Sequence, residues 1–113
     1  MNNQKNDLLK KKCVPCEEGG EPLKGADLQD YLDEAFGWAL NDKGTSISKE
    51  FKFQDFIGAI NFVERVADIA EEEGHHPDIH VYYNKVVLEL WTHKAGGLTQ
   101  NDFILAAKVD AYR

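Results

Sequence analysis

The segment at residues 79–92 reads IHVYYNKVVLELWT, and it predicts the fold class of the chain. Most of its residues are β-branched, aromatic or otherwise apolar, which favours extended strands. Asn84-Lys85 interrupts the apolar run with residues that suit a turn. We therefore predict one strand at residues 79–83 and a second at 86–92, paired antiparallel as a hairpin.

A second hairpin is predicted upstream of this segment. Ile47, Phe51 and Phe53 share one parity within residues 47–53, as expected for a strand with one buried face. A short apolar run at residues 38–40 precedes it, and the intervening residues 41–44 read NDKG, a strong turn signal. The chain therefore carries four predicted strands in two pairs.

A long amphipathic helix is predicted between the two hairpins. Apolar residues recur every three or four positions from Phe56 to Ala70 and form one stripe, which is typical of a helix packed on a core. Asp55 is the expected N-cap, the helix is expected to end near Glu73, and Gly74 is the expected C-cap.

Two further helices complete the pattern. The first is expected to begin at Asp27 and end at Gly37, and the last to begin at Thr99 in an approximate capping box. The order α-β-β-α-β-β-α predicts an α+β fold in which helices cover one face of a four-stranded antiparallel sheet. Because such a sheet leaves edge strands, we also expect self-association into a homodimer or homotetramer.

The first 26 residues are expected to form a flexible N-terminal leader that is dispensable for activity, before a single domain at 27–113. They contain two prolines and three glycines. They also contain Cys13 and Cys16, whose spacing suits a zinc half-site, a redox pair or simply two thiols in a leader.

The charge and hydropathy of the chain exclude several classes of partner. The net charge is −7 and no basic stripe is present, so direct binding to nucleic acid is not expected. No apolar run approaches the roughly 20 residues that a membrane-spanning helix needs. The N-terminus lacks the apolar middle of a signal peptide, so a cytoplasmic location is expected.

Histidines supply the candidate chemistry. Three of the four, His75, His76 and His80, lie within six positions, and His93 follows the last predicted strand. When the strands at 79–83 and 86–92 pair as a hairpin, the end of the second strand lies beside the start of the first. His93 is therefore expected to approach His75 and His76. Clustered histidines suit proton transfer near neutral pH or metal binding.

An ordered set of motifs resembles the pterin-4a-carbinolamine dehydratase family. The motifs are EEEGHHPD at 71–78, YNKV at 83–86, THKAGGLT at 92–99 and Asp102, with GW at 37–38 and the FKFQDF stretch at 51–56 upstream. The resemblance covers roughly residues 27–112. It implies removal of water from a 4a-hydroxytetrahydropterin to give the quinonoid dihydropterin, which supports pterin recycling for aromatic amino acid hydroxylation, without a cofactor or metal.

The resemblance also implies roles for individual residues. His75 and His93 are the candidate acid and base, His76 holds the substrate, and Glu71 accepts a ring N–H one helical turn before His75. The substrate-binding candidates are Trp38, Gly74, His75, His76, Pro77, Trp91, Thr92, His93, Lys94 and Asp102. Asp102 has a purely structural alternative at the helix N-terminus, and Trp38 has one in the core.

Two other functions stay open at this stage. A zinc site would use His76, His80, Asp78 and His93, but residues four apart on a strand lie about 13 Å from each other, too far for one ion. His80 is therefore interpreted as a surface or strand residue. Animal members of the family also bind a transcription factor, so a protein-binding or coactivator module of the same fold is the second alternative.

Overall fold

The structure is a computed structural model that describes Leu8, Lys11, Cys13 and residues 21–112. Over that part of the chain, the elements are α3 (Gly25–Glu34), β1 (Ala39–Leu40), β2 (Ile47–Lys52), α4 (Phe56–Glu73), β3 (Asp78–Tyr82), β4 (Lys85–Leu90), the short 3-10 helix η1 (His93–Ala95) and α5 (Gln100–Tyr112). The predicted succession of helices and strands is confirmed.

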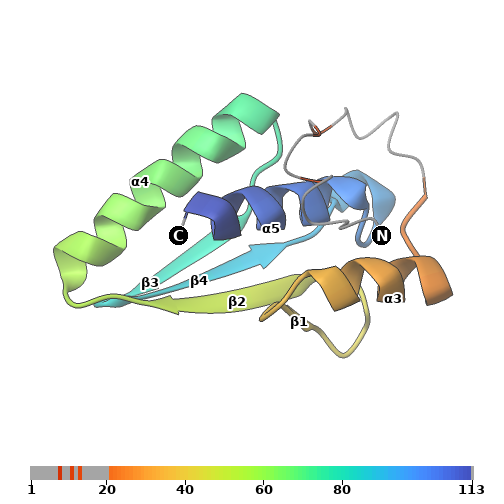
Figure 1. The fold of residues 1–113 in the computed structure, drawn as a ribbon, viewed down its shortest axis with the longest axis horizontal. Helices are drawn as coiled ribbons and strands as arrows, with labels where there is room; N and C mark the ends of the chain where they lie inside the picture. Colours follow the sequence, from red (N-terminus) through yellow and green to blue (C-terminus); the bar gives the residue numbers. More distant parts are fainter. Residues whose placement is uncertain (1–7, 9–10, 12, 14–20, 113) are drawn as a thin grey trace.

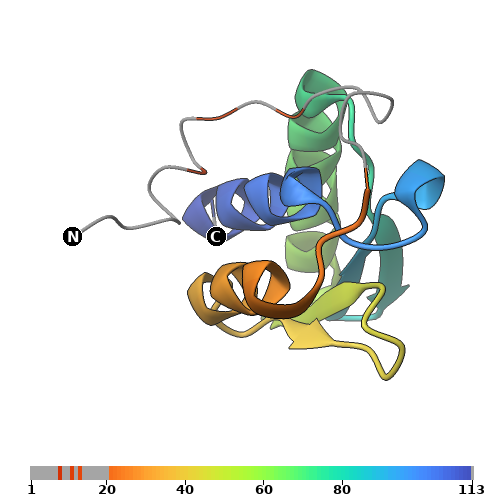
Figure 2. The ribbon, with the colours of Figure 1, turned by 90° about the vertical axis from the view of Figure 1, so that its right-hand side faces the viewer.

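The four strands form one antiparallel sheet in the order β1-β2-β4-β3. Figures 1 and 2 show the three helices on the same side of this sheet, so the predicted α+β architecture is confirmed. Strands β1 and β3 are the outer strands. Pairing of an outer strand with a second copy of the chain stays a prediction.

The core lies between the covered face of the sheet and the helices. Strand β4 alternates along its length, with Val86, Leu88 and Leu90 buried. Ile47 of β2 lies opposite Leu90, and Phe51 lies opposite Val86, so the buried residues of the two central strands face the same layer. Helix α5 runs between α4 and α3 in Figure 1, which explains why most of its residues are buried.

The caps of α4 lie where the sequence predicts them. The Asp55 carboxylate accepts a hydrogen bond from the Gly58 amide at 2.7 Å. At the other end Gly74 adopts φ 69°, a left-handed conformation that glycine enters without a Cβ clash. The chain therefore leaves α4 abruptly, and the next residue, His75, turns inward.

Several boundaries differ from the predictions by one to three residues, including the end of α3, which is Glu34 and not Gly37. Helix α3 begins at Gly25, with Asp27 inside its first turn, where a carboxylate favours the helix dipole without capping it. The hairpin turn is Tyr83-Asn84 instead of Asn84-Lys85, because Tyr82 pairs with Lys85. Tyr83 has φ 54°, while Asn84 exchanges hydrogen bonds with Phe53, through its carbonyl at 2.8 Å and its side-chain amide at 3.1 Å.

Leu8 and Cys13, which belong to the expected N-terminal leader, contact the domain. Leu8 is buried in the core, and the Cys13 amide donates to Glu73 Oε1 at 2.9 Å. Burial, together with the Glu73 carboxylate, raises the pKa of Cys13 to about 12. Zinc and disulfide exchange both need a thiolate, so this environment opposes both uses of Cys13. Cys16 lies outside the described residues, and the domain boundary at residue 26 stays a prediction.

Candidate functional site

His75 is the buried histidine of the cluster, and its partner is Asp102. The Nε2 atom of His75 lies 2.6 Å from Oδ1 of Asp102, which sits in the first turn of α5 and is fully buried. Residues 27 positions apart are thus joined where the C-terminus of α4 meets the N-terminus of α5. The structure brings these two predicted site residues into direct contact.

Two threonines complete the hydrogen bonding of Asp102. Its Oδ2 atom accepts from the Thr92 hydroxyl at 2.8 Å and from the Thr99 amide at 3.0 Å. The two threonine hydroxyls lie 2.8 Å apart, and both residues are buried. Because the Thr92 hydrogen goes to Asp102, the Thr99 hydroxyl donates to Thr92. The predicted capping box is thus half formed, and Asp102 serves both the helix and the histidine.

This network fixes the tautomer of His75. An ionised carboxylate only accepts hydrogen bonds, so the groups facing Asp102 are donors, and we assign one ring proton of His75 to Nε2. The Nδ1 atom is left with a lone pair when the ring is neutral. A proton taken up at Nδ1 produces an imidazolium directly beside the buried carboxylate, which stabilises it. Nδ1 is therefore the ring nitrogen of His75 that this arrangement leaves available for proton exchange.

The expected contact between Glu71 and His75 is wrong. Oε2 of Glu71 lies 2.5 Å from Nε2 of His76, and both side chains are exposed. The left-handed conformation of Gly74 explains why Glu71 contacts His76 and not His75. It turns His75 inward to Asp102 and leaves His76 exposed on the surface near the end of α4. Glu71 thus orients the exposed histidine.

His93 lies at the end of the β3–β4 hairpin that leads back to the cluster. The register pairs Asp78 with Glu89, so β3 begins where β4 ends. The Thr92 hydroxyl donates to Asp102, whose other carboxylate oxygen faces His75. His93 is the next residue after Thr92 and is exposed in η1. Its ring stacks on Trp91 with centroids 3.9 Å apart.

Trp38 and His80 lie apart from the buried pair. Trp38 is in the core, where its Nε1 atom donates to Asp110 at 3.0 Å. Asp110 follows Asp102 by eight residues on α5, a separation of about 12 Å along the helix axis. His80 is exposed on β3, opposite Val87. The remaining candidates flank the network: Gly74 and Lys94 are exposed and Pro77 is half-buried.

Sequence reasoning missed Thr99 as part of this network and assigned it only to the start of a helix. The capping-box spacing of Thr99 and Asp102 was the available signal. Within the described residues, no group of three or more His, Cys, Asp or Glu side chains is arranged to hold a metal ion. A separate finding is that no described helix is both long enough and apolar enough to cross a membrane.

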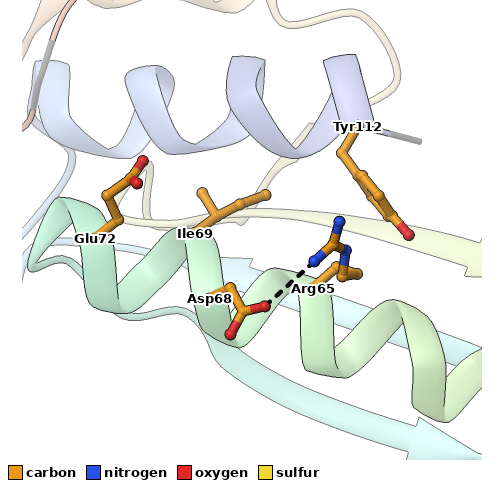
Figure 3. A pocket seen from close by; sticks show the side chains of 5 residues that line it. All are labelled: Arg65, Asp68, Ile69, Glu72 and Tyr112. Atoms are coloured by element: carbon orange, nitrogen blue, oxygen red, sulfur yellow. Dashed lines mark ion pairs between the residues drawn. The ribbon is translucent and has the colours of Figure 1, made fainter.

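Two surface hollows differ in their relation to the histidines. One, of about 210 Å³, lies between α4 and the end of α5 and holds no histidine; Figure 3 shows its lining, Arg65, Asp68, Ile69, Glu72 and Tyr112, with an ion pair between Arg65 and Asp68. The other, of about 580 Å³, is lined by Asp78 and by Trp91, the stacking partner of His93.

A family model described as Pterin 4 alpha carbinolamine dehydratase matches residues 21–112, which is most of the chain. This chain belongs to the pterin-4a-carbinolamine dehydratase family. The match includes the His75–Asp102 network and both hairpins. The family match begins after Cys13. Leu8 and Cys13, which contact the core, therefore lie outside the residues that the family model covers.

Relatives among the pterin-4a-carbinolamine dehydratases are similar along most of this chain. One from Rickettsia bellii, described as putative, is 44% identical over 104 residues and covers 91% of each chain. A mitochondrial one from Arabidopsis thaliana is 48% identical over 108 residues, covering 92% of this chain and 58% of its own. The crystal structure of a transcriptional coactivator/pterin dehydratase from Brucella melitensis has a TM-score of 0.76 at 34% identity, covering 80% of this chain and 97% of that one.

Proposed function

We propose that this chain dehydrates 4a-hydroxytetrahydropterins to the quinonoid dihydropterin by histidine acid–base catalysis. The observation that carries the proposal is the buried His75–Asp102 pair, at 2.6 Å, in a chain of the dehydratase family. The reaction breaks the C4a–O bond, removes the proton from N5 and forms the C4a=N5 double bond. It therefore needs one group that accepts a proton and one that gives a proton to the departing hydroxyl.

His75 suits the base and His93 suits the acid. Nδ1 of His75 takes the N5 proton, and the Asp102 carboxylate stabilises the imidazolium that results. His93 is exposed, so it can protonate the hydroxyl that leaves as water and then be reprotonated from solvent. His75 returns its proton to solvent after the product departs. Exposed His76, oriented by Glu71, holds the substrate at the rim.

A dehydration assay tests this function. Purified protein, treated with a metal chelator, is mixed with freshly generated 4a-hydroxytetrahydropterin, and the absorbance of the quinonoid product is followed. We expect the rate to exceed the uncatalysed dehydration in proportion to protein concentration, with or without chelator. An unaccelerated rate would contradict the proposal and leave the protein-binding module as the remaining alternative.

The N-terminal residues are proposed to stabilise the domain without taking part in turnover. A chain that begins at Glu21 loses the burial of Leu8, which is worth about 2 kcal/mol, and the hydrogen bond from Cys13 to Glu73. We expect a lower Tm and nearly unchanged kcat. A chain that begins at Ala26 also loses the bond from the Leu23 amide to the Leu98 carbonyl and should unfold at a lower temperature still. A truncated chain that folds but whose kcat falls a hundredfold would contradict the proposal that the N-terminal residues contribute to stability and not to turnover.

A further inference from the structure

One buried carboxylate takes no part in the proposed proton transfers. Glu73 is the last residue of α4, and its side chain is fully buried. The run EEE at 71–73 is typical of a solvated helix end, but only Glu71 and Glu72 are exposed. A buried carboxylate is costly unless it is paired and hydrogen-bonded. The contacts that Glu73 makes are therefore the evidence for its role.

Glu73 forms an ion pair with Lys108 of α5. Its Oε2 atom lies 2.6 Å from Nζ of Lys108, whose side chain is 18% exposed. Helices α4 and α5 pack against each other, and Figure 1 shows that they run in opposite directions. Lys108 follows Asp102 by six residues, about 9 Å along the helix axis. Because side chains on a helix lean toward its N-terminus, Lys108 reaches back toward the end of α5 that carries Asp102.

The other oxygen of Glu73 is connected to α5 on the opposite side of Asp102. Oε1 accepts a hydrogen bond from the Cys13 amide at 2.9 Å, and Sγ of Cys13 lies 3.6 Å from the carbonyl oxygen of Asn101. Asn101 directly precedes Asp102. The end of α4 is thus fixed to α5 on both sides of Asp102, directly through Lys108 and indirectly through Cys13.

The position of His75 depends on the last turn of α4. Gly74 is the single residue between Glu73 and His75, and the His75 amide donates to the Ala70 carbonyl at 3.2 Å. His75 therefore moves with this turn, while Asp102 moves with α5. Catalytic groups must be held to within about 0.5 Å of their working geometry. A slide of α4 along α5 would separate Nε2 of His75 from Oδ1 of Asp102, which now lie 2.6 Å apart.

A buried ion pair is suited to prevent such a slide. Apolar side chains of similar volume often replace a buried ion pair without loss of stability, so stability alone does not require one here. Hydrophobic contacts are non-directional and allow neighbouring registers. A short contact between two charged groups is lost when either helix shifts. The ion pair of Glu73 with Lys108 therefore favours one register of α4 on α5.

We propose that Glu73 and Lys108 are positioning residues, whose buried ion pair sets the register of α4 on α5 that brings His75 onto Asp102. This rests on the proposed function, because it concerns how the proton acceptor is held. Neither residue contacts the substrate. The hydrogen bond from Cys13 supports Glu73, but the direct contact with Lys108 remains in a chain that begins at Glu21.

The double variant Glu73→Met/Lys108→Met tests the proposal. It replaces both charges with unbranched apolar side chains, so the helices stay packed while the ion pair is lost. We expect kcat to fall about tenfold to a hundredfold with little change in KM, the loss that a misplacement of about 1 Å causes. Circular dichroism and thermal unfolding verify the fold. The chain that begins at Glu21 isolates the loss of the Cys13 hydrogen bond, and its kcat should stay near the wild-type value.

A proton resonance reports the position of His75 independently of turnover. The Nε2–H proton lies in a short charge-assisted hydrogen bond to a buried carboxylate. It should therefore appear far downfield in the ¹H NMR spectrum and be missing from the spectrum of His75→Ala. We expect Glu73→Met/Lys108→Met to shift this resonance or to lose it through exchange with water. A general loss of stability in a folded protein would leave it in place.

Asp110→Asn is the matched control, because it breaks a second ion pair of the same helix. Oδ1 of Asp110 lies 2.9 Å from Nζ of Lys49, and the Asp110 side chain is 7% exposed. This variant should have a lower Tm, with kcat and the His75 resonance at their wild-type values.

The double variant decides the proposal when the wild-type protein is active. If it folds and either kcat or the His75 resonance stays at the wild-type value, the positioning role is overturned. Should it fail to fold, Lys108→Gln takes its place under the same criterion, because glutamine still donates to Glu73 but carries no charge.

Failure of the proposed function has a different signature. Wild-type protein that does not accelerate the dehydration overturns the activity, and the His75 resonance then decides the positioning role alone. A shifted resonance in the folded double variant supports that role, and an unchanged resonance overturns it.

Discussion

His75→Ala is expected to lower kcat by about 10²–10⁴-fold, the usual contribution of a positioned acid or base. The reason is that Nδ1 of His75, whose Nε2 atom faces the Asp102 carboxylate, accepts the N5 proton of the substrate only as the C4a–O bond breaks. KM should change much less, because an interaction made in the transition state affects kcat. Steady-state kinetics, with circular dichroism to verify folding, measure both quantities.

His93→Ala should show the same dominant loss of kcat, and the double variant should lose less than the product of the two single effects. Groups that act together in one elimination are not additive, and water can substitute for a missing proton carrier. His76→Ala is the contrasting variant, because the exposed His76 should mainly raise KM. A normal kcat in His75→Ala or His93→Ala would remove that residue from the proposed roles.

Asp102→Asn is expected to be as damaging to turnover as the loss of His75 itself. Both oxygens of Asp102 accept hydrogen bonds, so the amide nitrogen of the Asn must replace one acceptor. The Thr99 N–H can only donate, so the nitrogen faces His75 and donates to Nε2, which drives the ring proton from Nε2 to Nδ1. The base then lacks its lone pair. A change from carboxylate to amide beside a catalytic histidine costs about 10⁴-fold in serine proteases.

Asp110→Asn is the control for Asp102→Asn. Asp110 is on the same helix and binds Trp38 and Lys49, so the change to Asn removes the ion pair with Lys49 and one hydrogen-bond acceptor without touching His75. We expect it to lower stability and leave kcat near the wild-type value. Equal losses of kcat in the two variants would mean that Asp102 acts through the stability of α5 and not through the tautomer of His75.

The succession of elements was predictable because the ends of α4 and the alternation of the strands carry local signals. The stripe of α4 lies between Asp55 and Gly74, and the two hairpins alternate between a buried and an uncovered face. Tyr83 escaped prediction, because a left-handed tyrosine has no signature in the sequence. Its conformation depends on contacts between Asn84 and Phe53, which lies 31 residues earlier.

The contacts among the candidate site residues were harder to predict than the return of the chain to the histidine cluster. The hairpin argument correctly placed the end of β4 beside the histidine cluster, since Thr92 shares Asp102 with His75. The resemblance implied that Glu71, one helical turn before His75, accepts a ring N–H there, but helical spacing ceases to apply once Gly74 ends the helix. The packing of Trp38 beside α5 likewise depends on tertiary contacts that spacing does not encode.

The most direct test of the central claim is kcat for His75→Ala and His80→Ala, measured side by side with the wild type after removal of metal by a chelator. His80 is exposed on β3 and makes no contact with Asp102. Metal-free acid–base catalysis predicts full activity for the treated wild type, near-normal activity for His80→Ala and a loss of at least a hundredfold for His75→Ala, at the lower end of the range for such groups. Abolition of wild-type activity by the chelator, with His80→Ala as damaged as His75→Ala, would contradict the account and establish a metal site in its place.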